Sequence, residues 1–126
     1  MARISKAEAS IDLESPVLTS RRAELDAFTV VFEEYHLDAD GAPVFRGLPD
    51  DRCQCPHWGV VVSGQLVLRY ADGEETYRAG DAYVARPGHV PAVIAGTEVI
   101  EFSPTDELAK TLAVIAANMA DMGAAS

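Results

Sequence analysis

The most informative part of the sequence opens with CQCPHWG at Cys53–Gly59 and closes with GDAYVARPGH at Gly80–His89. It holds both cysteines and two of the three histidines. Between the two runs lie two β-type segments and an Asp-Gly turn. Two groups of metal-binding side chains separated by a hairpin meet in space if the strands close into a barrel. The stretch therefore predicts a metal or small-molecule pocket.

Short strands and turns continue on both sides of this stretch. Asp72-Gly73 is a hairpin signal because Asp-Gly tolerates the positive φ of a tight turn. From His57 onward a turn signal recurs about every eight residues, which is typical of a β-sandwich or barrel rather than of alternating β/α units. The expected strands are residues 30–37, 57–62, 66–70, 75–78, 82–85, 90–95 and 98–102.

The two ends of the chain have different patterns. Residues 1–27 are polar with scattered apolar positions, and we expect an N-terminal arm or short edge strand. Residues 28–103 form the predicted barrel, with a loop over 44–52. Residues 104–123 are predicted to be an amphipathic helix with Ser103 as N-cap and Gly123 at its end. Its apolar stripe, which must pack on the β-layer or on a second subunit, comprises Leu108, Leu112, Ile115, Met119 and Met122.

Bulk properties limit the classes of function. The chain has 126 residues, enough for one domain, and its net charge of −10 disfavours nucleic acid and anionic membrane surfaces as partners. No apolar run approaches the ~20 residues that a membrane span needs, and the first residues lead into no secretory core. Two cysteines two positions apart do not make a disulfide framework. We therefore expect a cytoplasmic protein with reduced thiols.

Metal-binding side chains cluster on one predicted face. In an extended chain Asp51, Cys53, Cys55 and His57 point to the same side. Thiolate and imidazole are favoured by Zn²⁺ and also suit Fe²⁺ or Ni²⁺. The spacing is not that of a zinc finger. We expect one pocket that uses Cys53 or Cys55 with His57 and His89, which leaves one coordination position open.

Structural roles for the same residues are left open by the sequence. Either cysteine can be a small buried hydrophobic residue, His57 a hydrogen-bonded histidine at the rim, and His89 an exposed turn residue. His36 has no Cys or His neighbour and is assigned a structural role. Two arginines, Arg69 and Arg86, either grip an acidic ligand or balance nearby carboxylates.

Several of these residues resemble the two sequence motifs of the cupin family. The resemblance is carried by HWGVVVSG at His57–Gly64, by Gly80-Asp81 and by Pro87-Gly88, and the wider string is similar to small bacterial single-domain cupins. It covers roughly residues 28–103. It implies a mainly β fold: a double-stranded β-helix, which is an antiparallel jelly-roll barrel with a central pocket, here followed by a C-terminal α-helix.

The chain departs from the cupin motifs at each ligand position. Anchored on Gly64, the glutamate of the first motif falls on His57, and its two histidines fall on Cys53 and Asp51. Anchored on Gly88, the histidine of the second motif falls on Pro91, which cannot ligate a metal, and His89 lies two positions early. Either the site is rewired, or the pocket has lost its metal and binds an organic ligand or nothing. In the rewired site Cys53, His57 and His89 bind the metal, with Cys55 or Asp51 as a spare ligand.

The predicted function is that of a small cupin-domain protein with a divalent metal (Zn, Fe or Ni) in the barrel pocket, which acts on or binds a small polar molecule. The alternative is a metal-free binding or sensor module without catalysis. The residues expected to line the pocket are Gly59, Val61, Tyr70, Tyr83 and Glu101. A homodimer is also predicted, through the helix stripe or through an outward face with Trp58, Val60 and Val62.

Overall fold

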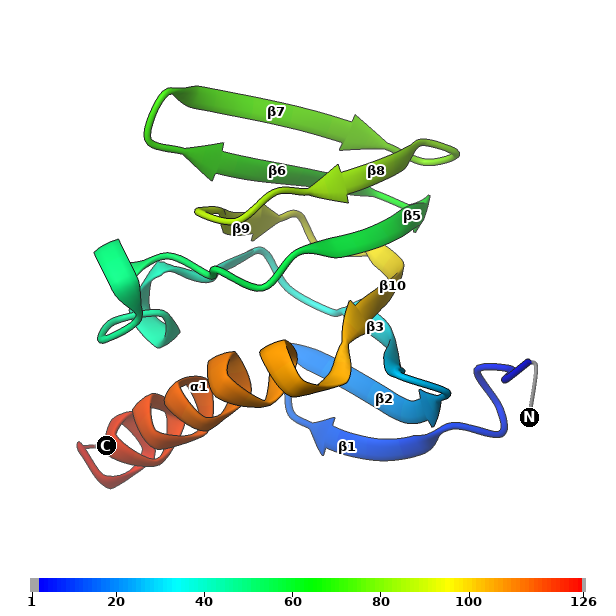
Figure 1. Ribbon diagram of the computed structural model, residues 1–126, viewed down its shortest axis with the longest axis horizontal. Helices are drawn as coiled ribbons and strands as arrows, with labels where there is room; N and C mark the ends of the chain where they lie inside the picture. Colours follow the sequence, from blue (N-terminus) through cyan, green and yellow to red (C-terminus); the bar gives the residue numbers. More distant parts are fainter. Residues whose placement is uncertain (1–2, 126) are drawn as a thin grey trace.

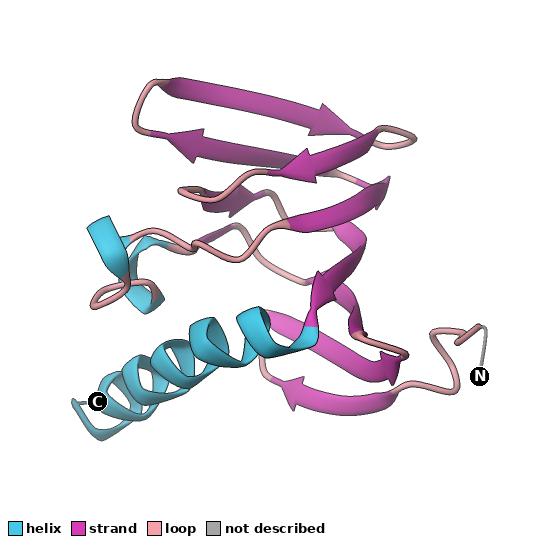
Figure 2. Ribbon diagram, viewed as in Figure 1, coloured by secondary structure: helices cyan, strands magenta, loops and turns pink. Residues whose placement is uncertain are grey.

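The computed structural model describes residues 3–125, which fold into two antiparallel β-sheets and one long helix (Figures 1 and 2). The larger sheet has the strand order β1 (Ser10–Glu14), β2 (Leu18–Leu25), β3 (Phe28–Tyr35), β10 (Glu98–Pro104), β5 (His57–Ser63) and β8 (Ala82–Ala85). The smaller sheet has the order β4 (Ala39–Asp40), β9 (Val90–Val93), β6 (Gln65–Tyr70) and β7 (Gly73–Arg78). The predicted mainly β fold with a C-terminal helix is confirmed.

The N-terminal segment, expected to be an arm or a short edge strand, contains two strands. Two of its stretches form β1 and β2, which pair with each other and extend the larger sheet beside β3. The apolar side chains that hold β2 in place are few: Ala23 and Leu25 pack beside the buried Val30 and Phe32 of β3. Only one face of β2 carries this packing, so its apolar signal in the sequence is weak.

The chain passes from the larger to the smaller sheet at Gly64, between β5 and β6. Gly64 has φ of +79°, and a Cβ at this position would collide with Thr97. The Thr97 hydroxyl accepts a hydrogen bond from the Gln65 N–H at 3.0 Å and donates one to the Gln65 carbonyl at 3.1 Å. Glycine is required here because the corner needs both the positive φ and the close approach.

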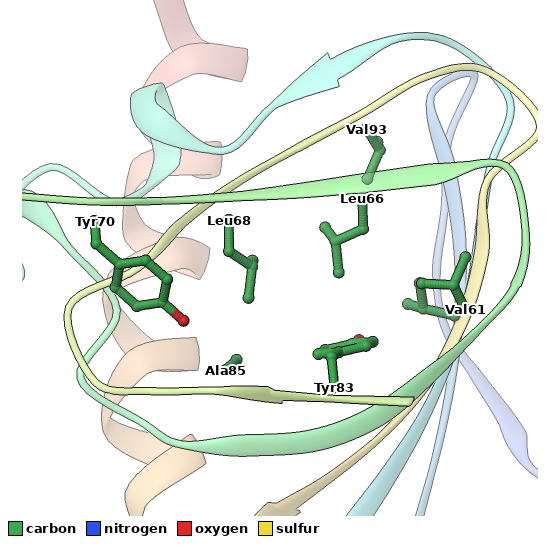
Figure 3. Close-up of a cluster of buried hydrophobic side chains, with 8 residues drawn as sticks. Val61, Leu66, Leu68, Tyr70, Tyr83, Ala85 and Val93 are labelled. Carbon is green, nitrogen blue, oxygen red and sulfur yellow. The ribbon is translucent and has the colours of Figure 1, made fainter. Parts of the chain in front are cut away.

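The space between the two sheets is filled by a hydrophobic cluster (Figure 3). In Figure 3, Leu66, Leu68 and Tyr70 of β6 point across the interior toward Tyr83 and Ala85 of β8. The remaining members are Val61, Val93 and Val99. Val61, Tyr70 and Tyr83, expected to line a pocket, are thus buried members of the core.

Helix α1 (Thr105–Ala125) extends along one end of the molecule beside two short 3₁₀ turns, η1 (Ala42–Val44) and η2 (Pro49–Asp51) (Figure 1). Leu108 is buried against Phe45, Leu48 and Val90. In the second half of the predicted stripe, Met119 and Met122 are exposed. In the described part of the chain, no helix combines the length and the apolar character needed to cross a bilayer.

The start of α1 also differs from expectation. Ser103 was predicted as the N-cap, and this is wrong, because Ser103 and Pro104 continue β10 in register with Thr29 and Phe28. The helix begins directly after them, at Thr105. Ser103 is 1% exposed, so its side chain lies in the interior and does not cap the helix.

Candidate metal centre

Strand register brings a row of side chains together on the inner face of the larger sheet. His57 is the first residue of β5, as expected, and lies opposite Ala85 of β8. Because Glu101 pairs with Gly59 and Phe102 with Trp58, Ser103 of β10 comes next to His57. Side chains directly opposite each other in an antiparallel pair point to the same face. Ser103, His57 and Ala85 therefore form one cross-strand row.

Cys53 and His89 reach this row through an isolated backbone bridge. The Cys53 N–H donates to the His89 carbonyl at 2.9 Å, and the Gly88 N–H donates to the Cys53 carbonyl at 2.8 Å. These two residues come from the runs Cys53–Gly59 and Gly80–His89. The bridge holds the runs side by side at the end of the barrel.

Cys53, His57 and His89 form a compact buried cluster. One ligand atom from each lies within 4.8 Å of the other two. Cys53 Sγ is 3.6 Å from His57 Nε2, and the two imidazole rings lie 4.9 Å apart at an angle of 65°. All three side chains are less than a tenth exposed.

Hydrogen bonds fix the orientation of both imidazoles. His89 Nδ1 lies 2.7 Å from the carbonyl oxygen of Arg86. A carbonyl only accepts, so Nδ1 carries the proton and the neutral ring leaves Nε2 as a free acceptor. His57 Nδ1 lies 2.6 Å from Ser103 Oγ, and its Nε2 faces the Cys53 thiol. Metal-binding histidines are typically oriented in this way, through the nitrogen that does not ligate.

Without a metal, burial favours the uncharged forms of the His89 imidazole and the Cys53 thiol. Burial, with a smaller contribution from His57, lowers the pKa of His89 to about 4, so its imidazole is neutral at neutral pH. Burial also raises the pKa of the Cys53 thiol, against weaker opposing hydrogen bonds from Thr111 and Cys55. A buried thiol with a raised pKa is a poor nucleophile. These three side chains, Cys53, His57 and Ser103, contact one another in turn. Their arrangement is therefore better suited to metal binding than to nucleophilic catalysis.

The donor set and its sulfur–nitrogen separation fit a transition metal. One thiol and two imidazoles are ligands preferred by zinc and acceptable to iron or nickel. With Zn–S near 2.3 Å and Zn–N near 2.0–2.1 Å, a tetrahedral sulfur–nitrogen edge is about 3.5 Å. The Cys53–His57 separation of 3.6 Å is close to this value.

The other sequence candidates lie outside the cluster. Cys55 is buried, its Sγ lies 3.4 Å from the carbonyl of Pro56, and burial, with Cys53 adding, raises its pKa to about 12. Asp51 is exposed in η2 and accepts a hydrogen bond from the Gly47 N–H at 3.0 Å. His36 is exposed and lies 2.8 Å from Thr19 Oγ1.

A polar pair occupies the next row of the inner face. Tyr83 and Glu101 flank Gly59, and the Tyr83 hydroxyl donates to the Glu101 carboxylate across it. A Cβ on Gly59 would lie 2.7 Å from the Tyr83 ring, so glycine is needed for this contact. Burial, followed by the charge of Glu101, raises the Tyr83 pKa far above its ordinary value. Rows two residues apart are separated by roughly 7 Å, which places this pair beside His57.

Sequence reasoning missed two residues of the site. Ser103 was assigned to the helix start, and nothing local indicates its contact with His57. Thr111 of α1 is 5% exposed, and its Oγ1 lies 3.7 Å from Cys53 Sγ. Thr111 follows Leu108 by three positions, so both lie on the same side of the helix. This spacing was the one sequence pattern that indicated a buried Thr111.

Comparison with known proteins identifies the architecture. No protein-family model and no curated protein matches the chain. Among solved structures, KdgF from Halomonas sp. is 19% identical, with a TM-score of 0.55 over 79% of this chain and 90% of that one. An RmlC-like cupin from Shewanella frigidimarina is 14% identical, with a TM-score of 0.53 over 80% and 88%. A putative ethanolamine utilization protein from Salmonella typhimurium is 9% identical, with a TM-score of 0.57 over 81% and 85%.

These likenesses are structural, because all three identities lie below 20%. They agree with the two antiparallel sheets and with the expectation drawn from His57–Gly64 and Pro87-Gly88. The described part of the chain has the cupin fold, a jelly-roll barrel of two antiparallel sheets.

Proposed function

We propose that this cupin-fold protein holds a divalent transition metal, Zn²⁺, Fe²⁺ or Ni²⁺, on Cys53, His57 and His89. There it acts on or binds a small polar molecule. The observation that carries the proposal is the buried cluster of one thiol and two imidazoles, with ligand atoms within 4.8 Å of one another. Three protein ligands leave one position for the small molecule.

Each surrounding residue has a physical task in this proposal. Ser103 and the Arg86 carbonyl hold the two imidazoles through Nδ1 and leave both Nε2 atoms for the metal. The Thr111 hydroxyl supports Cys53 when its thiol gives up a proton to become a thiolate ligand. When bound, the metal supplies Lewis acidity to an oxygen of the small molecule.

Tyr83 and Glu101 supply the polar side of the site. Glu101 is half-buried, so its carboxylate keeps some contact with solvent. We assign this carboxylate and the Tyr83 hydroxyl, which bond to each other in the row next to His57, to the recognition of a molecule held at the metal. A ligand with hydroxyl or amine groups matches these partners. Two surface hollows in the described part of the chain, of about 410 and 240 Å³, are lined by other residues.

Metal binding is tested on protein purified without a metal-affinity tag. Elemental analysis is expected to find close to one transition metal per chain. After chelation, added Co²⁺ is expected to give the near-ultraviolet charge-transfer band of a cobalt–thiolate bond. Cys53→Ser abolishes this band, and His57→Gln and His89→Gln weaken metal binding by at least about tenfold.

The chain offers matched controls for these variants. Cys55→Ser removes a thiol that is equally buried but lies outside the cluster, and His36→Gln removes an exposed imidazole. Both controls should bind cobalt as the unmodified protein does. A cobalt–thiolate band that survives Cys53→Ser, or the absence of any binding of Zn²⁺, Co²⁺ and Ni²⁺, contradicts the proposal.

We also propose that two copies of the chain pair through the outer face of the larger sheet. This face carries the exposed Trp58, Val62, Val84 and Phe102. Trp58 makes an edge-to-face contact with the exposed ring of Phe28, with ring centroids 6.2 Å apart. Contiguous exposed apolar side chains of this kind are typical of interaction surfaces.

A further inference from the structure

A second hollow, which contains none of the three proposed metal ligands, is lined by two arginines. It has a volume of about 240 Å³ and is bounded by Ala42, Arg52, Arg69 and Val90. Ala42 belongs to η1, Arg52 follows η2, and Arg69 and Val90 lie opposite each other on β6 and β9. The hollow therefore lies between the η1–η2 segment and the smaller sheet.

Arg52 is held in place by main-chain carbonyl groups. Its Nη1 donates to the Arg69 carbonyl at 3.0 Å and to the Gly88 carbonyl at 3.4 Å. The side chain is half-buried. A long side chain that is already ordered loses little further conformational entropy when it binds a ligand. The Arg52 guanidinium is thus prepared for a partner.

Arg69 is held by an ion pair that leaves part of its guanidinium unused. Its Nη2 contacts Asp40 Oδ1 at 2.5 Å, and the same carboxylate oxygen accepts a hydrogen bond from the Ala42 N–H. Arg69 Nε is buried and has no hydrogen-bond partner among the described residues. Buried donors without a partner are rare in native proteins and are often satisfied by water or an ion.

The donors around the hollow suit an anion. Arg69 is paired with the exposed Asp40 and lies opposite the exposed Glu74 on β7, so these carboxylates balance the two guanidinium charges. Arg69 Nε nevertheless has no hydrogen-bond partner among the described residues. Guanidinium groups bind the oxygens of planar carboxylates and tetrahedral phosphates through paired N–H donors. Ala42 and Val90 supply the apolar part of the lining.

We propose that this hollow binds a small oxyanion, a carboxylate or phosphate group, between Arg52 and Arg69. The site is distinct from the metal-binding cluster. The backbone of Arg52 is extended, so its side chain points away from that of the following residue, Cys53. The hollow contributes no ligand atom to the cluster, and its occupancy does not require a metal.

The test uses the full chain after chelation of metals. Melting temperature is measured with sodium phosphate and with sodium succinate, against sodium chloride at the same ionic strength. A specific oxyanion at tenfold excess over its dissociation constant should raise the melting temperature by roughly 4–6 °C. Calorimetric titration with the same two salts gives the dissociation constants directly. Stabilisation by phosphate alone or by succinate alone supports the site and identifies its preferred oxyanion.

Substitution of single arginines tests where the oxyanion binds. Arg52→Gln and Arg69→Gln are each expected to weaken binding by about tenfold or more. Arg78→Gln, at an exposed arginine on the outer strand β7, should leave binding unchanged. Arg69→Lys keeps the charge and should bind more weakly than arginine, because lysine lacks the paired donors.

Two results overturn the proposal. One is equal melting temperatures in phosphate, succinate and chloride for the unmodified chain. The other is oxyanion binding that Arg69→Gln leaves intact while Arg78→Gln removes it. Because every measurement is made without metal, a negative result here leaves metal binding by Cys53, His57 and His89 unaffected.

Discussion

A half-buried glutamate on the inner face of β3 allows a sharp test of the structure. Glu33 lies opposite Val99 on β10, and burial, followed by the charges of Glu101 and Asp12, raises its pKa to about 8. Its neighbour Tyr35 also has a raised pKa, for which burial and then Glu33 are the largest causes. Below pH 4.5 the Glu33 carboxyl is protonated in both the folded and the unfolded chain, so its burial as a charge does not lower the free energy of unfolding. As the pH rises toward 8, only the unfolded chain releases the proton readily, so stability falls over this window.

The magnitude follows from the size of the pKa change. Each pH unit between 4.5 and 8 lowers the free energy of unfolding by up to about 1.4 kcal/mol. The largest possible loss over this window is therefore about 5 kcal/mol. Glu33 is half-buried and shares the unfavourable charge with Glu101, so we expect less than half of this loss. Glu33→Gln keeps the shape of the side chain and removes the charge. It should stabilise the metal-free chain by about 2 kcal/mol at pH 8 and by nearly nothing at pH 4.5.

Urea unfolding at both pH values, followed by circular dichroism, measures this difference. Glu74→Gln, at an exposed glutamate of β7, is the matched control and should change stability by less than about 0.5 kcal/mol at either pH. A Glu33→Gln variant that is destabilised at pH 8, or that is stabilised equally at both pH values, would refute the assignment of Glu33 to the interior.

Three further predictions concern the corner, the polar pair and the assembly. Gly64→Ala should cost at least about 3 kcal/mol, from positive φ and collision with Thr97. Gly73→Ala, which also has a positive φ, of +144°, but has open space around it, should cost less in the same urea titration, because it adds backbone strain without a collision. Tyr83→Phe should lower stability by roughly 1.5–3 kcal/mol in thermal unfolding, because Glu101 loses its donor, and unchanged stability contradicts the contact. Light scattering should find a homodimer that Trp58→Glu converts to monomer, whereas dissociation by Met122→Glu instead would assign the interface to α1.

Local residue chemistry was sufficient for much of the fold. Asp72-Gly73 and Pro87-Gly88 mark chain reversals by the backbone conformations that these residues allow, and alternating side chains between them indicate strands. The same local signals place His57 at the first position of a strand and put Cys53 and His89 at the two ends of one stretch. They also predict an amphipathic helix after the last strand, although its starting residue was wrong.

Which of these residues meet depends on how the elements pack together. Ser103 contacts His57 from 46 positions away, and Thr111 approaches Cys53 from 58 positions away. Sequence patterns report which face a side chain occupies on its own element, whereas contacts between elements depend on strand register and on where the helix packs. For the same reason the sequence predicted a barrel with a pocket, and the packed chain filled that interior with Val61, Leu68 and Tyr83. Register across β3, β10, β5 and β8 then placed two imidazoles, a thiol and a carboxylate–tyrosine pair in adjacent rows.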